Sequence, residues 1–164
     1  MFRRPFLFAA MLAAGGLMPA LAQTSAPAAE RTDIAARFAE HYLWAWSSAN
    51  PIAIPSMEAF YAQTVTFHGR DVSYNAVVEE KRRFVRRWPI RDYRHRPGSM
   101  NVQCDAEAEI CVVQSVIDYT ARDHRGRRAR GSAEFELGLS FASGRPVIVY
   151  ENSRPAAGRT AAAD

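Results

Sequence analysis

Three side chains in this sequence have the chemistry to move a proton or to hold a polar ligand. Lys81 is the single lysine among 21 basic residues, and it lies in an apolar run rather than with the arginines. His95 titrates near neutral pH, and Tyr119 carries a phenol that can donate a hydrogen bond. If these three converged on one cavity, they could act as a lyase or isomerase on a small hydrophobic substrate.

Lys81 and His95 also have simpler interpretations. Lys81 can extend its ammonium group to solvent from the edge of a helix, and His95 can be a hydrogen-bonded histidine at the rim of a sheet. The most obvious strand carboxylate, Asp118, falls by period-two alternation on the face opposite the core. Because no acid and base pair is visible, we expect no catalytic residue. We also expect no metal site, because the two cysteines have no histidine or further cysteine at ligand spacing, and no cofactor.

A set of aromatic residues could close a ligand pocket, although the same spacings also occur in an ordinary core. The predicted pocket residues join these aromatics to the polar candidates: Trp46, Lys81, Trp88, Tyr93, His95, Tyr119 and Phe135.

One amphipathic helix organises the surrounding elements. Apolar residues recur at helical spacing from Tyr74 to Arg87, with Ser73 as the N-cap and Pro89 ending the run. Lys81 falls on the apolar stripe of this helix. An earlier helix is predicted from Thr32 or Asp33 to about Ala49, and a short one over 55–62.

Period-two alternation after this helix predicts antiparallel strands with one buried face. Between 90 and 100 the alternation is ambiguous. A bulge at Pro97-Gly98 would bury Tyr93 and His95, whereas strict alternation would bury Arg94 and Arg96. Burying two guanidinium groups without partners costs several kcal/mol, so we predict the bulge.

The two cysteines predict a disulfide across a hairpin. Cys104 and Cys111 flank the segment DAEAEI, and a four-residue loop closed by Asp105 and Ile110 would place them opposite each other on the core face. An oxidising compartment would favour the bond.

The N-terminus predicts such a compartment. Residues 1–22 have the basic, apolar and small-residue parts of a secretory signal peptide, so we expect an exported, periplasmic or secreted protein without a transmembrane segment in the mature chain. The predicted organisation is a signal peptide (1–22), a disordered lead-in (23–31), one domain (32–153) and a disordered tail (154–164).

Arginines dominate the basic residues, and two stretches of them are dense. Eight basic residues and one acid lie between Lys81 and Arg96. This stretch is either a solvated face or an anion-binding surface. A second group crowds the hairpin from Ala121 to Arg130, where solvation is the simpler interpretation. An anionic envelope component is a possible partner of these charges, and nucleic acid is excluded by the predicted export.

The order and spacing of the elements resemble the nuclear transport factor 2-like superfamily, which includes ketosteroid isomerase and the SnoaL-like cyclases. The resemblance rests on three segments: Tyr42–Ser47, the passage from Phe60 to Gly69, and Arg87-Trp88-Pro89. It covers residues 32–153. It implies an α+β fold with three N-terminal helices packed on a strongly curved antiparallel sheet, a cone-shaped, cystatin-like roll. It also implies a cavity between helices and sheet, and often a dimer through the sheet.

These expectations favour a non-catalytic domain that binds a small apolar or anionic ligand or serves an accessory interaction. The SnoaL-like lyase or isomerase is the alternative. A homodimer is a third possibility, through an outward sheet face that carries five polar residues: Gln103, Gln114, Asp118, Glu134 and Glu136.

Overall fold

The computed structural model describes residues 28–47, 59–105 and 107–156. Two helices and seven strands occupy these ranges. The helices are α1 (Ala28–Ser47) and α3 (Tyr74–Arg87). The strands are β1 (Tyr61–Phe67), β2 (Arg70–Ser73), β3 (Ile90–His95), β4 (Asn101–Asp105), β5 (Ile110–Arg122), β6 (Arg128–Ser140) and β7 (Val147–Pro155).

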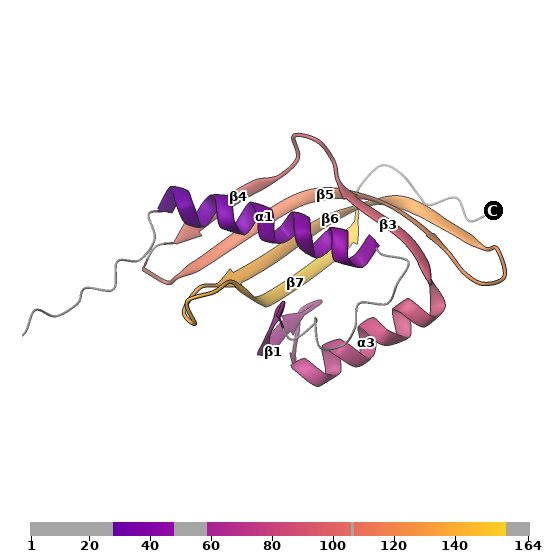
Figure 1. The fold of residues 1–164 in the computed structure, drawn as a ribbon, viewed down its shortest axis with the longest axis horizontal. Coiled ribbons are helices and arrows are strands. Elements are labelled where there is room, and N and C mark those ends of the chain that lie inside the picture. The colour runs from indigo at the N-terminus through magenta and orange to yellow at the C-terminus, as the bar shows by residue number, and fades with distance from the viewer. Residues whose placement is uncertain (1–27, 48–58, 106, 157–164) are drawn as a thin grey trace, which may run out of the picture.

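All seven strands form one sheet in the order β2-β1-β7-β6-β5-β3, with β4 also paired to β5. The long hairpin of β5 and β6 is its centre, and α1 lies across the sheet while α3 lies near β1 (Figure 1). β1 runs parallel to β7 and every other pairing is antiparallel. The α+β prediction is confirmed, but the sheet is mixed. Local alternation could not predict the parallel pair, because a parallel neighbour is brought in from far along the chain.

The organising helix has the predicted bounds. Ser73 has extended backbone and its hydroxyl accepts a hydrogen bond from the Ala76 amide, which satisfies one of the free N–H groups of the first turn. Val77 and Val78 are buried, and the helix ends before Trp88-Pro89. Lys81 follows Val77 by four residues and therefore lies on the same face of α3.

The first helix begins at Ala28, earlier than predicted, so the lead-in stops before it. Arg31 is the physical reason. Its guanidinium is buried, contacts the Glu109 carboxylate at 3.3 Å and lies over the Phe141 ring. The buried Arg31 side chain thus holds the first turn of α1 against the sheet, with the partly exposed Glu109 as its partner.

The C-terminal end of the domain also differs from the prediction, and some predicted segments lie outside the described residues. β7 continues to Pro155, which pairs with Ala133, so the ordered chain extends into the predicted tail. Residues 55–58 of the short predicted helix lie outside the described residues, and the helix prediction is wrong for its other half, which is a turn at Ala59 and Phe60 followed by the start of β1 at Tyr61. The predicted signal peptide also lies outside them. Within the described ranges, neither helix has the length and hydrophobicity needed to cross a bilayer.

The core lies on one face of the sheet, as the alternation predicted. Its fully buried side chains include Tyr42, Val65, Val77, Val113, Leu137, Leu139 and Ile148. The predicted bulge orientation is also found: Tyr93 and His95 are half-buried, while Arg94 and Arg96 are exposed. Arg96 instead pairs with Asp118 at 2.6 Å on the outer face. The predicted homodimer through that face stays a prediction.

The disulfide prediction is confirmed together with its register. Cys104 lies opposite Cys111, and Asp105 lies opposite Ile110, so the strands are joined by the four-residue loop. The two sulfur atoms are bonded at 2.06 Å. The bond fixes the register that turns Val102 and Val113 toward the core.

Replacing both cysteines by serine should lower the free energy of unfolding by about 2 kcal/mol. The effect is modest because the disulfide closes only a short loop and therefore restricts the unfolded chain little. Urea unfolding followed by circular dichroism measures the change, and reduced wild-type protein is the matched control. A folded protein with two free thiols, found by intact mass, would contradict the pairing.

Candidate functional site

A cavity of about 410 Å³ lies between α1, α3 and the sheet. Aromatic residues are the largest group in its wall. The aromatic residues that border it are Tyr42, Trp46, Phe67, Phe84, Trp88, Tyr93, Tyr119 and Phe135. Such a wall favours flat apolar molecules, because aromatic rings bury large areas and stack on one another.

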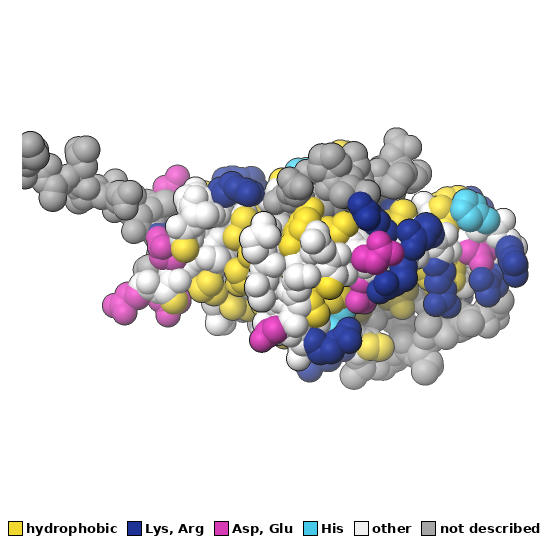
Figure 2. All heavy atoms as spheres, turned by 90° about the horizontal axis from the view of Figure 1, so that it is seen from below, with side chains coloured by type: hydrophobic (Ala, Val, Ile, Leu, Met, Phe, Trp, Pro, Cys, Tyr) yellow, Lys and Arg dark blue, Asp and Glu magenta, His cyan; other side chains and the backbone are white. Residues whose placement is uncertain are grey.

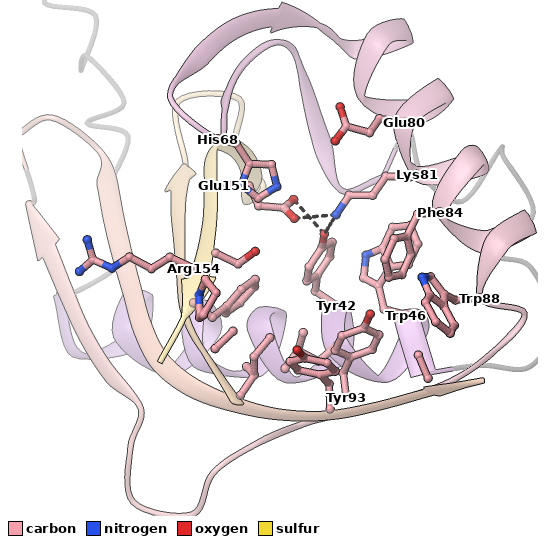
Figure 3. A pocket seen from close by; sticks show the side chains of 18 of the residues that line it. Tyr42, Trp46, His68, Glu80, Lys81, Phe84, Trp88, Tyr93, Glu151 and Arg154 are labelled. Atoms are coloured by element: carbon pink, nitrogen blue, oxygen red, sulfur yellow. Dashed lines mark hydrogen bonds and ion pairs between the residues drawn. The ribbon is translucent and has the colours of Figure 1, made fainter. Parts of the chain in front are cut away.

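Three polar side chains of this wall, Tyr42, Lys81 and Glu151, contact one another (Figure 3), and Tyr61, which does not border the cavity, completes a buried polar cluster with them. The Lys81 ammonium donates to Glu151 Oε1 at 2.6 Å and to the Tyr42 hydroxyl at 2.8 Å. Glu151 Oε2 accepts from Tyr42 at 2.8 Å and from Tyr61 at 2.5 Å. The carboxylate therefore accepts three hydrogen bonds, and its charge is balanced by Lys81 at direct contact.

The polar cluster of Tyr42, Tyr61, Lys81 and Glu151 is almost removed from water. The side chains of Lys81 and Glu151 are 15% and 5% exposed. Burial, and next the Glu151 charge, raise the pKa of Tyr42 and Tyr61 well above its ordinary value, so both phenols stay protonated as donors. The ammonium also lies 4.5 Å from the Trp46 ring centroid, a favourable cation–π distance.

Glu151 reaches the cavity because of a bulge in β7. Leu139 pairs with Ile148 and Gly138 pairs with Tyr150, so the residue between Ile148 and Tyr150 is extra. The bulge reverses the alternation, and Glu151 lies opposite Leu137 on the core face. Gly138 permits this close approach, since a Cβ there would lie 2.9 Å from the Tyr150 Cβ.

Sequence reasoning missed Glu151 for this reason. Strict alternation from the buried Ile148 places Glu151 on the solvent face. The available signal was a carboxylate following the apolar run VIVY, but the bulge that directs it inward is set by pairing with Gly138.

Arg91 is a second residue that the sequence analysis missed. It is 3% exposed, and its guanidinium donates to the backbone carbonyls of Trp46 at 3.1 Å and Trp88 at 2.6 Å. Burial lowers the pKa of Arg91 from its ordinary value. These bonds connect the end of α1 to the end of α3, and thus fix two tryptophans of the cavity wall.

Six of the seven predicted pocket residues border the cavity: Trp46, Lys81, Trp88, Tyr93, Tyr119 and Phe135. Tyr93 and Tyr119 lie side by side with ring centroids 6.1 Å apart, and burial raises the pKa of Tyr93 to about 12. Whether these residues bind a ligand stays a prediction.

His95 is not among the residues that border the cavity. Its Nδ1 lies 2.8 Å from the Ser115 hydroxyl, and the backbone of Ala39 in α1 lies beside the ring. Burial lowers the pKa of His95, so the ring is neutral near pH 7. The structure therefore does not gather His95 with Lys81 and Tyr119 around one cavity, because α1 covers the histidine. Within the described ranges, no three potential metal ligands come together.

No family model matches the sequence, and no curated protein matches it. Solved structures do match the fold. A protein from Novosphingobium aromaticivorans with the provisional name aromatic ring hydroxylase matches with a TM-score of 0.69 and 8% identity over 82% of this chain and 94% of its own.

Two further structures give the same result. A protein from the same organism, provisionally named scytalone dehydratase, has a TM-score of 0.66 and 10% identity over 83% of this chain and 93% of its own. A nuclear transport factor 2-like superfamily protein from Salmonella enterica has a TM-score of 0.62 and 11% identity over 80% and 92%. At these identities the likeness establishes the fold alone.

Glu151→Gln should lower the free energy of unfolding by about 3 kcal/mol or more, because it leaves the Lys81 ammonium buried without a counter-charge. Adding Lys81→Met should recover part of this loss, since both charges are then gone. Urea unfolding of the two single variants and the double variant measures the coupling.

The matched control is Arg83→Met, which removes an exposed cation from the same helix and should change stability by less than about 0.5 kcal/mol. Strictly additive effects of the two cluster substitutions would contradict a buried ion pair.

Proposed function

Because the chain has the fold of the nuclear transport factor 2-like superfamily, we propose that it is a binding domain for a small, flat, largely apolar molecule that carries a hydrogen-bonding oxygen. The ligand would occupy the cavity between α1, α3 and the sheet. The observation that carries this proposal is an aromatic wall interrupted by one self-neutralised polar cluster.

The charges around the cavity favour an uncharged ligand over an anionic one. Lys81 is neutralised by Glu151 at 2.6 Å. Arg154 borders the cavity, but its guanidinium points away from the polar cluster (Figure 3) and contacts Glu134 at 2.5 Å. Glu80, which also borders the cavity, adds a further negative charge. A buried anion would therefore meet no uncompensated cation there.

Lys81 supports the recognition of an oxygen atom. Its ammonium carries three N–H groups, of which Glu151 and Tyr42 accept two. The third can donate to a carbonyl or hydroxyl oxygen of the ligand, and such a charge-assisted bond is strong when water is excluded. Trp46 and Phe67, whose rings lie near the ammonium, would contact the adjacent apolar part.

A proton-transferring lyase or isomerase is the second candidate function. The observation that favours it is the Glu151 carboxylate at the cavity wall, beside protonated phenols. Against it, the oxygen atoms of Glu151 already accept hydrogen bonds from Lys81, Tyr42 and Tyr61. These three bonds use three of the about four lone-pair sites of the carboxylate, and they stabilise its charged form, which makes it a weaker base. We therefore favour binding without catalysis.

Export is part of the same proposal. A disulfide between Cys104 and Cys111 is stable in oxidising compartments and rare in reducing ones. The signal-like leader of residues 1–22 agrees with it.

The proposal predicts an order of affinity among three naphthalenes of similar size, measured by quenching of Trp46 and Trp88 fluorescence. The ketone 2-acetylnaphthalene should bind about tenfold more tightly than 2-ethylnaphthalene, because only the ketone accepts from Lys81. The anion 2-naphthoate should bind more weakly than the ketone. Tightest binding of the naphthoate, or equal binding of ketone and hydrocarbon, would contradict the proposed ligand class.

Two variants locate the binding. Ala133→Leu fills part of the cavity and should weaken binding of the ketone. Thr120→Leu adds the same side chain on the exposed face and should leave that binding unchanged. Equal effects of the two substitutions would place the ligand elsewhere.

A further inference from the structure

A second hollow, of about 540 Å³, lies at the turn end of the β5–β6 hairpin, where Arg122 and Arg128 are the last paired residues. Three arginines border it together with a threonine and an exposed isoleucine: Arg122, Arg128, Arg130, Thr120 and Ile90. This hollow shares Ala121 and Ala129 with the lining of the aromatic cavity, but none of its polar side chains borders that cavity.

The strand register places these side chains on one face. Arg122 lies directly opposite Arg128, and Thr120 lies opposite Arg130. Ile90 of β3 pairs with Arg122 from the other side. Side chains of directly paired residues point to the same face, so the three guanidinium groups share one surface.

This arrangement places like charges together, and the carboxylate on the same face, Asp92 opposite Thr120, pairs with Arg94 instead. Directly opposed cations destabilise a pair of strands. The nearby carboxylates are already engaged: Asp123 accepts from Arg127 at 2.6 Å, and Asp92 contacts Arg94 at 3.1 Å. Among the residues that the structure describes, no carboxylate forms an ion pair with the three arginines of the hollow.

Other basic side chains gather on the same half of the molecule as the hollow. Seen from below, Lys and Arg side chains gather over the half of the molecule that holds the end of α3 and the β5–β6 hairpin (Figure 2). Such a region raises the local concentration of anions and directs them to the site where guanidinium groups can bind them.

We propose that this hollow binds a phosphate group. Three guanidinium forks and one hydroxyl match the tetrahedral oxyanion of a phosphate ester, because each fork can donate two parallel hydrogen bonds to it. Ile90, which is 46% exposed, adds apolar surface beside the charges. The phosphate would come from a soluble phosphate ester or from a lipid headgroup.

The test follows the side-chain Nε–H signals of Arg122, Arg128 and Arg130 by NMR during titration with glycerol 1-phosphate at constant ionic strength. Saturable shifts of these signals are expected. Arg128→Gln with Arg130→Gln should weaken binding about tenfold or more, since two charge-assisted sets of bonds are lost. Sedimentation with phosphatidylglycerol vesicles, against phosphatidylcholine vesicles, forms the second arm.

The matched control is Arg70→Gln with Arg83→Gln, which removes two exposed arginines that do not border the hollow. It should weaken binding by less than about threefold, because distant surface charges are screened. Binding of the ester supports a soluble ligand, and binding of anionic vesicles alone supports a headgroup. An equal loss in both double variants, or no binding in either arm, would overturn the proposal. Unchanged 2-acetylnaphthalene binding in the variants shows that the fold and the cavity are intact.

Discussion

The buried ion pair between Lys81 and Glu151 is the constraint on which the site depends. Removing two opposite charges from water is costly, and the cost is offset only when the charges touch and their remaining hydrogen bonds are satisfied. Here the partners that satisfy them are Tyr42 and Tyr61. The four residues come from α3, β7, α1 and β1, so the pair is stable only when these elements meet at one place.

The same interaction determines what the cavity can hold. Because Lys81 and Glu151 neutralise each other, the polar cluster adds no net charge to the cavity wall. One N–H group of the Lys81 ammonium stays available for a ligand. The bulge in β7 is what directs Glu151 to that wall. Without the bulge the cavity would contain an uncompensated ammonium group, and an anion would be its natural ligand.

The features that could be predicted from the sequence are those that depend on residues close together along the chain. The bounds of α3 follow from Ser73 and Pro89, and the disulfide follows from the hairpin between its cysteines. The orientation of His95 toward the core was predicted from the cost of burying arginines, yet its separation from the cavity was not. That separation depends on where α1 crosses the sheet. Glu151 was missed because its direction is set by pairing with a distant strand, which alternation along β7 does not contain.

In the proposed function, the polar cluster holds a ligand and does not take a proton from it. The most direct test is hydrogen exchange of 2-acetylnaphthalene in deuterated buffer, because its acetyl protons lie next to the carbonyl group that Lys81 would bind. Saturating protein should leave the rate of deuterium incorporation at the level of buffer alone. Faster incorporation that is lost in Glu151→Gln, with ketone binding retained, would contradict it and show that the carboxylate is a catalytic base.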